Sequence, residues 1–213
     1  MKLYSRFQNS AGERVRIALN LKGIAYDYVP VSSLAPGEYR RINPQGLLPA
    51  LEADGRFIAQ SGAILEYLEE THPAPPLLPA DPVLRAQARA FGAHIAAEMH
   101  AMTVNRVRAF LAADLRLDAA AVHAWVSHWL TEGLRALEAT LDARPEQTPF
   151  CFGDAPGWAD LHLVPQLANA RRLNVDVAPF RRLLAVEARC VVLEAFRRAR
   201  PEAQPDFRPD VSR

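Results

Sequence analysis

"QNSAGERVRIALNLKG" (residues 8–23) follows the short run KLYSRF (residues 2–7), which contains residues that favour a strand. This order predicts a strand, a tight turn and then a helix from about residue 11 to 22. In thiol redox proteins, cysteines occupy a turn of this kind. Here the turn reads Asn9-Ser10-Ala11-Gly12, so it offers polar groups and no sulfur of its own.

The helix that follows the turn has one polar stripe. Its apolar residues are Val15, Ile17, Ala18, Leu19 and Leu21. Arg16 and Asn20 are four residues apart, which places them on one face of a helix, and we expect this face to be exposed to solvent. Gly23 is a typical C-terminal stop for the helix.

Four more elements follow before a proline-rich stretch. They are a strand at AYDYVPV (25–31), two strands at PALEA (49–53) and RFIAQ (56–60), and a helix at SGAILEYLEETH (61–72). Pro30 lacks an N–H group, so it bars its strand from a central hydrogen-bonded position. Asp54-Gly55 predicts a hairpin between the next two strands. The predicted order is therefore βαβ, a β-hairpin and a helix.

Residues 71–82, THPAPPLLPADP, hold five prolines and cannot continue a helix. We therefore expect a first domain over residues 1–72, a linker over 73–82 and a second domain over 83–213. The pattern of the second domain is helical throughout, with predicted helical stretches at 83–113, 118–143 (with Asp118 as the N-cap), 157–173 and 179–199. The tail from residue 200 onward is rich in charges and prolines, and it is predicted to fray. A cleft that binds a small ligand is expected between the domains.

Composition excludes several classes of function. Half of the 213 residues are apolar and the net charge is +1, which argues against bulk electrostatic binding to nucleic acid or membranes. No apolar run approaches the roughly 18 residues of a membrane span. Cys151 and Cys190 lie far apart and give no metal-ligand spacing, and the six histidines are interpreted as surface or packing residues. We expect a soluble protein of the reducing cytoplasm without a metal.

Four stretches together resemble the cytosolic glutathione transferases over essentially the whole chain. They are NSAGERVRIALNLKG (9–23), INPQGLLPALE (42–52), AQSGAILEYLEE (59–70) and FGDAPGWADLHLVPQ (152–166). Within that family the chain is most similar to the zeta class, which includes maleylacetoacetate isomerase and maleylpyruvate isomerase. The resemblance implies an α/β, thioredoxin-like N-terminal domain, an all-helical C-terminal domain, glutathione as the cofactor and a homodimer.

The missing sulfur would then come from glutathione. Lowering a thiol pKa from about 8.5 to about 6.5 needs close to 3 kcal/mol of thiolate stabilisation. A helix N-terminus supplies about 0.3–1 kcal/mol, and a hydrogen bond to a charged acceptor about 1.5–3 kcal/mol, so a donor at the turn is required. The candidates are the Ser10 hydroxyl, the backbone N–H groups of Ala11 and Gly12, and the Asn9 amide. The alternative for Ser10 is an ordinary N-cap.

The resemblance also assigns residues to the tripeptide. A cis Leu48–Pro49 bond is typical of the family, and the backbone of Leu48 would pair with the cysteinyl part of glutathione. Gln60 and Ser61 would bind the γ-glutamyl carboxylate, with Ser61 doubling as a helix N-cap whose positive dipole end favours an anion. Gln45 would reach the other end of the tripeptide. The alternative for Gln45 is a solvated loop residue.

Four positions depart from the zeta pattern. Gln8 stands where the class has Arg, Asn9 where it has Ser, and Leu47 where it has Gln. Gly157 stands where the family has Ser or Thr, so we expect Asp160 to form only half of a capping box with the start of its helix. The change at Gln8 removes one cation and would suit a less charged substrate.

The activity that the resemblance implies is glutathione-dependent cis–trans isomerisation of a dicarboxylate, in aromatic amino acid catabolism. Arg172 occupies the position of a substrate-binding Arg, and Arg171 is a fallback; surface arginines that suit the end of a helix are the alternative. Asn105 and Arg106 are further candidates for substrate contact. Competing functions are a transferase that conjugates or dehalogenates small electrophiles, and a non-catalytic binding module. The thiol-free turn disfavours a glutaredoxin-like reductase.

Overall fold

The computed structural model describes residues 1–209 and divides the chain into two compact units. Unit 1 combines Met1–Leu77 with the chain from Val191 onward, and unit 2 is Leu78–Cys190. The sequence pattern indicates one boundary, in the proline-rich stretch, whereas the structure has a second one at Val191. Residues 210–213 of the predicted second domain lie outside the described residues.

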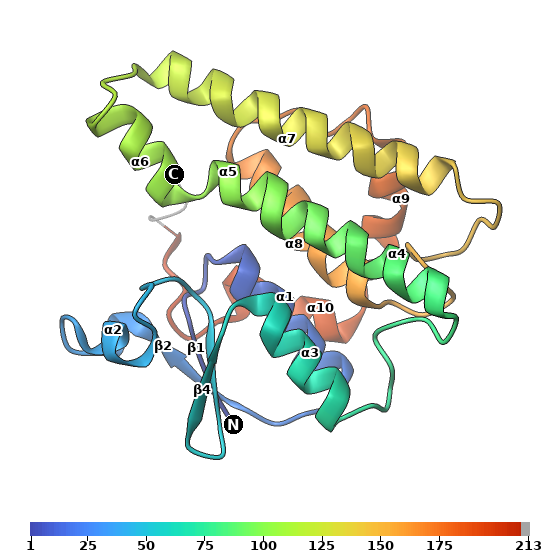
Figure 1. Cartoon of the computed structure of the whole chain (residues 1–213), viewed down its shortest axis with the longest axis horizontal. Coiled ribbons are helices and arrows are strands. Elements are labelled where there is room, and N and C mark those ends of the chain that lie inside the picture. The colour runs from blue at the N-terminus through green and yellow to red at the C-terminus, as the bar shows by residue number, and fades with distance from the viewer. Residues whose placement is uncertain (210–213) are drawn as a thin grey trace. The chain divides into compact units, whose positions relative to one another are not determined.

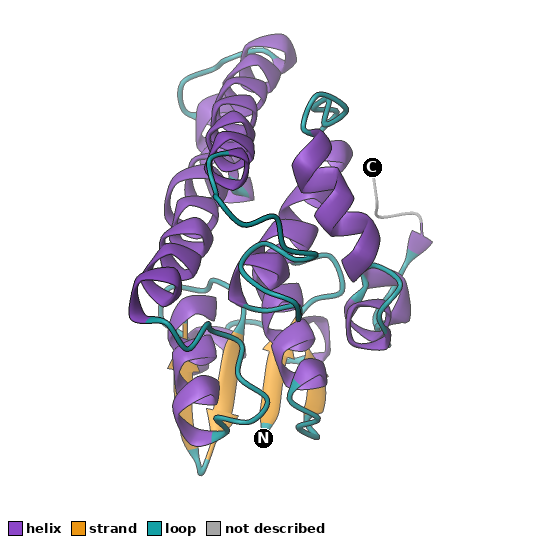
Figure 2. Ribbon diagram, turned by 90° about the vertical axis from the view of Figure 1, so that its right-hand side faces the viewer, coloured by secondary structure: helices purple, strands orange, loops and turns teal. Residues whose placement is uncertain are grey.

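Unit 1 contains a four-stranded sheet with the order β2-β1-β3-β4 (Figure 2, orange). The strands are β1 (Lys2–Ser5), β2 (Asp27–Pro30), β3 (Ala50–Ala53) and β4 (Arg56–Ala59). β1 pairs in parallel with β2 and antiparallel with β3, as the predicted βαβ unit and hairpin require. Pro30 ends the edge strand β2, and Asp54 and Gly55 both have a positive φ at the hairpin turn. The thioredoxin-like arrangement of the first half is thus confirmed.

The helices of unit 1 are α1 (Ser10–Leu21), α2 (Glu38–Ile42), α3 (Ser61–Thr71) and α10 (Glu194–Ala199), with the short 3-10 helices η1 (Val31–Ser33) and η3 (Pro201–Ala203). α10 packs against α1, although the two are far apart in the sequence (Figure 1). The predicted stretch 179–199 is divided between two helices that belong to different units.

The prediction that the polar stripe of the first helix is exposed to solvent is wrong. The side chain of Arg16 is fully buried, and its Nε donates to the carbonyl of Ala199 at 2.8 Å. Asn20 donates through Nδ2 to the carbonyl of Ala195 at 2.9 Å. The polar stripe therefore faces α10, where Asn20 bonds a carbonyl near the start of that helix and Arg16 bonds the carbonyl of its last residue, which the helix itself leaves without a partner.

The tail is ordered through residue 209, contrary to the predicted fraying. Phe207 packs edge-on against Phe7 with ring centroids 5.6 Å apart, and Asp206 accepts hydrogen bonds from two groups of the sheet region. The apolar and polar anchors of this segment lie at the other end of the sequence, so local composition does not reveal them.

Unit 2 is helical, as predicted. Its helices are α4 (Pro82–Ala93), the π-helical segment η2 (His94–His100), α5 (Ala101–Thr103), α6 (Asn105–Ala113), α7 (Ala119–Asp142), α8 (Trp158–Arg172) and α9 (Arg181–Cys190). Asp118 caps α7 as expected, accepting the Ala121 N–H at 2.8 Å. The predicted stretch 83–113 is interrupted at Val104, which has an extended backbone.

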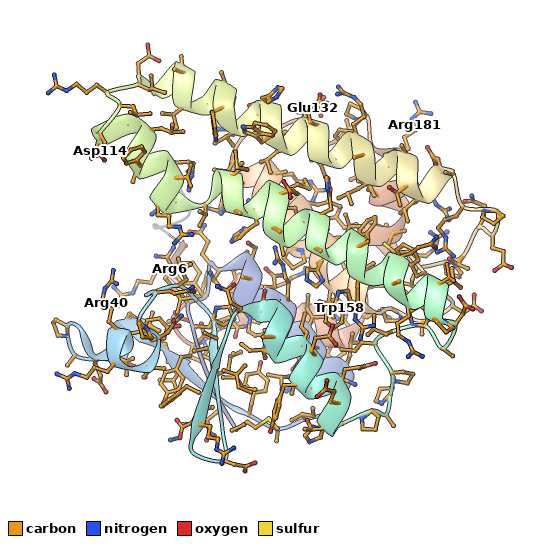
Figure 3. The ribbon with its side chains drawn as sticks, in the orientation of Figure 1. Arg6, Arg40, Asp114, Glu132, Trp158 and Arg181 are labelled. Atoms are coloured by element: carbon orange, nitrogen blue, oxygen red, sulfur yellow. The ribbon has the colours of Figure 1, made fainter. Side chains whose placement is uncertain are left out.

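The start of α8 is the best-buried part of unit 2. Asp160 accepts the backbone N–H groups of Gly157 and Cys151 at 2.8 and 2.9 Å, so the expected half of the capping box forms. The Trp158 ring, seen at the start of α8 in Figure 3, lies so close to α4 that a Cβ on Gly92 would be 2.7 Å from its Nε1. Among residues 1–209 no helix is both long and apolar enough to cross a membrane.

Candidate functional site

At the turn between β1 and α1, the helix N-cap lies one residue earlier than the Ser10 cap that the sequence suggests. Asn9 has an extended backbone and is the N-cap, and its Oδ1 accepts the N–H of Gly12. Its carbonyl accepts the N–H of Glu13 at 2.8 Å. Ser10 is the first helical residue, so the alternative interpretation of Ser10 as the ordinary N-cap is wrong.

Gly12 allows α1 to begin in close contact with the strand before it. A Cβ at this position would lie 2.1 Å from Oγ of the buried Ser5 and 2.6 Å from Oδ1 of Asn9. Both distances are far below a van der Waals contact, and both partners are short, held side chains. The turn therefore depends on the absence of a side chain at Gly12.

This geometry changes the set of donors available to an anion. The Gly12 N–H is engaged by Asn9, and the same carboxamide still carries its Nδ2 donor. Ser10 and Ala11 begin the helix, where backbone N–H groups and the positive end of the dipole favour negative charge. Of the four predicted donors for a thiolate, the Gly12 N–H is thus bonded within the turn. The roles of the Ser10 hydroxyl, the Ala11 N–H and the Asn9 amide stay predictions.

Besides Arg16, two further charged side chains are buried in the first turns of α1, Glu13 and Arg14. Burial raises the pKa of Glu13 from 4.5 to about 7, although Arg16 opposes the shift. Burial lowers the pKa of Arg14 to about 10, which leaves it protonated at neutral pH. A protonated Arg14 beside a partly neutral Glu13 gives this helix start a positive character that suits an anion.

The start of α3 is a second candidate site for an anion. Gln60 is the N-cap, with a positive φ of 71°, and no side chain in the described part of the chain caps this helix. Ser61, predicted as the N-cap, is instead the first helical residue and is buried. The N–H groups of the first turn are therefore left for a ligand, because only the fourth, that of Ile64, bonds back to the Gln60 carbonyl at 3.0 Å.

The structure brings Gln45 and Gln60 together, as residues of one binding site should be. Gln60 donates through Nε2 to Oε1 of Gln45 at 2.7 Å, across fifteen residues of sequence. Gln45 is exposed, and its side chain accepts a hydrogen bond from Gln60, the N-cap of α3; its role toward a ligand stays a prediction.

The loop that carries Gln45 is organised by two residues that the sequence analysis missed. Buried Asn43 and Tyr39 both donate to the carbonyl of Leu47, at 2.6 and 2.7 Å. The Leu48–Pro49 bond is cis, as the resemblance implies. The Asn-Pro pair at the start of NPQG, which is typical of a turn, was the sequence signal that could have identified this loop.

The predicted substrate residues lie on two helices of unit 2. Arg171 is paired with Glu187, with one nitrogen–oxygen distance of 2.6 Å, and this bond raises its pKa. Arg172, in the same last turn of α8, donates to the amide oxygen of Asn169. Asn105 and Arg106 begin α6, both exposed. The contact of these residues with a substrate stays a prediction, as does the cleft between the domains.

Comparison with known proteins agrees with this geometry. Residues 6–76 match the family of the glutathione S-transferase N-terminal domain. A maleylpyruvate isomerase from Ralstonia sp is 42% identical over 210 residues, which cover 97% of this chain and 99% of the relative.

Two solved structures have the same fold as this chain. One, described as holo maleyl pyruvate isomerase, a bacterial glutathione-S-transferase in the zeta class, has a TM-score of 0.93 and 42% identity, and covers 98% of this chain and 100% of its own. A maleylacetoacetate isomerase from Anaeromyxobacter dehalogenans 2CP-1, with bound dicarboxyethyl glutathione and citrate in its active site, has a TM-score of 0.87 and 38% identity. That match covers 100% of this chain and 96% of the other.

Proposed function

Because this chain belongs to the zeta class of the glutathione transferase family, we propose that it is a glutathione-dependent cis–trans isomerase that acts on maleylpyruvate or maleylacetoacetate. Relatives with these activities match the chain over nearly its whole length. The observation that carries the proposal is the uncapped start of α3, with Gln45 and Gln60 joined beside it.

The residues of unit 1 fit glutathione at both of its ends. The first-turn N–H groups of α3, with the Ser61 hydroxyl, would hold the γ-glutamyl carboxylate, since a helix N-terminus without a side-chain cap favours an anion. Gln60 would orient the γ-glutamyl group, Gln45 would reach toward the glycyl end, and the backbone of Leu48 would pair with the cysteinyl part. Leu47 offers no side-chain hydrogen bond to the glycyl end.

When bound, glutathione supplies a thiolate for reversible addition to the substrate's double bond, and this permits rotation about that bond. The chain's own contribution is to hold that sulfur ionised. Ser10 would donate its hydroxyl to the sulfur, with the Ala11 N–H and the Asn9 amide as further donors. The buried positive charge of Arg14 and the α1 dipole add long-range stabilisation.

Substrate carboxylates need cations, and Arg172 is the proposed partner. Arg171 is the fallback, and its guanidinium is paired with Glu187. Arg172→Ala should raise KM for the dianionic substrate about tenfold or more, the loss expected when one hydrogen bond between charged groups is removed. The exposed Arg181, labelled in Figure 3, gives a matched control as Arg181→Ala. Equal KM values for the two variants would reject the role of Arg172.

The activity itself is tested with purified protein and either substrate, with and without glutathione, followed by NMR. We expect the trans product only when glutathione is present, with the glutathione recovered unchanged. Turnover without glutathione would reject the cofactor, and stoichiometric consumption of glutathione would favour the transferase alternative.

We also propose a cytoplasmic homodimer that serves aromatic amino acid catabolism. The homodimer that is usual in this family supports the dimer. The two free, buried cysteines are consistent with a reducing compartment. Sedimentation equilibrium tests the dimer: a single monomeric species at working concentration would contradict it.

A further inference from the structure

Phe7, between β1 and the turn, is held by Arg16 of the next helix and by two residues near the C-terminal end of the chain. Its N–H donates to Oδ2 of Asp206 at 3.0 Å, and its carbonyl accepts from Nη2 of Arg16 at 3.2 Å. Its buried ring meets Phe207 edge-on at 5.6 Å. The ladder between β1 and β2 ends at Ser5, so a side chain has to satisfy the Phe7 N–H that lies beyond it.

The same carboxylate ties this point to the edge of the sheet. Oδ1 of Asp206 accepts the hydroxyl of Tyr28, on β2, at 2.9 Å. Burial and this hydrogen bond raise the pKa of Tyr28 well above its usual value, so the hydroxyl remains a donor at neutral pH. Arg16 closes the network by donating from Nε to Ala199 at the end of α10. Segment 199–207 thus holds the chain just before the turn.

We propose that Asp206 is a positioning residue for the thiolate-stabilising turn, acting through the backbone of Phe7. The inference rests on the proposed function of that turn. Phe7 is two residues before the cap Asn9, and the turn has little freedom to adjust, because Gly12 lies directly against Ser5 and Asn9. If Phe7 moves, the Asn9 cap and the donors beside it move with it.

The test compares Asp206→Ala with Asp206→Asn and with Arg208→Ala, a change at an exposed residue of the same segment. Two quantities are measured: the pKa of the bound glutathione thiol, from thiolate absorbance, and amide hydrogen exchange at residues 7–12 of the ligand-free protein. Asp206→Ala should raise the thiol pKa by about half a unit to one unit and speed exchange about tenfold, the loss expected for one hydrogen bond to a charged group. Asp206→Asn keeps an acceptor oxygen for the Phe7 N–H, so it should restore most of both.

Urea unfolding separates positioning from stability alone. If Asp206→Ala lowers the unfolding midpoint but leaves the thiol pKa and the exchange of residues 7–12 equal to those of Arg208→Ala, the proposal is overturned. It is also overturned if Asp206→Asn is as impaired as Asp206→Ala. If the wild-type protein binds no glutathione, the proposed function fails, whereas the exchange measurement still decides whether Asp206 orders the turn.

Discussion

The two helices that begin at the proposed glutathione site start in different ways. α1 is capped by Asn9 and packs closely against β1, so the Gly12 N–H in its first turn is already bonded. α3 begins after a left-handed Gln60 with no side-chain cap, so its first turn is left open. Both helices offer the same partial positive charge. The comparison suggests how capping would select the anion in the proposed function: a single sulfur at the capped start of α1, and a whole carboxylate at the uncapped start of α3.

The largest effect is expected from Gly12→Ala, which forces a methyl group into the closed helix start. Overpacking of this kind costs about 1–3 kcal/mol, and the displaced Asn9 cap should also abolish most turnover. Gly62→Ala is the matched change at the open helix start, where an added Cβ meets nothing within 4 Å, and it should be neutral or stabilising. The free energy of unfolding from urea titration measures both. Equal losses would remove the distinction between the two helix starts.

The next effect is pH dependence from the buried carboxyl of α1. Because the pKa of Glu13 rises from 4.5 to about 7 on folding, the folded state holds its proton more tightly. The stability from this group is therefore complete below about pH 4.5 and is lost as the pH rises toward about 7. Glu13→Gln should unfold with a free energy up to about 3 kcal/mol above wild type at pH 8, and near wild type at pH 4.5.

Glu70→Gln, at an exposed carboxyl of α3, is the control for this measurement. A difference between wild type and Glu13→Gln that stays the same at both pH values would contradict the assignment.

Ser10→Ala tests the proposed donor role of the Ser10 hydroxyl at the start of α1. Removing one hydrogen bond to the thiolate should raise the pKa of bound glutathione by about one unit, which is about 1.4 kcal/mol, and lower turnover at neutral pH about tenfold. The thiol titration is the direct measurement. If Ser10→Ala titrates like wild type, Asn9 or the backbone performs this role, and Asn9→Ala then becomes the informative variant.

The smallest effect is expected at the open helix start, where a neutral pair assists backbone groups. Gln45→Ala and Gln60→Ala should each weaken glutathione binding about three- to tenfold, with a coupling of about 0.5–1.5 kcal/mol in a double-mutant cycle. Calorimetric titration measures the affinities, and exposed Gln87 provides a control substitution. Strictly additive losses would mean that the bond between the two side chains does not serve binding.

Most of what the sequence predicts correctly is local. The hairpin at Asp54-Gly55, the Asp118 cap and the strands around Pro30 follow from turn chemistry, capping and a missing N–H group. The family resemblance located the loops that carry Gln45 and Gln60. What the sequence could not reveal depends on distant partners: Arg16 is polar and four residues from Asn20, yet both are satisfied by α10.

The site shows the same limit at shorter range. Two polar residues in a row, Asn9 and Ser10, both suit a cap, and only the backbone geometry decides that Asn9 caps and Ser10 begins the helix. The role of Asp206 is beyond any pattern, because its partner Phe7 is 199 residues away and the bond goes to a backbone N–H.

The return of the chain to unit 1 at Val191 has a consequence for synthesis on the ribosome. When β1 and α1 emerge, Arg16 has no acceptor for its Nε, because Ala199 follows 183 residues later. A nascent chain that ends before Val191 holds all of unit 2 but only part of unit 1. We therefore expect the part of the protein that is translated first to complete its fold last, the reverse of the usual order of folding from the N-terminus.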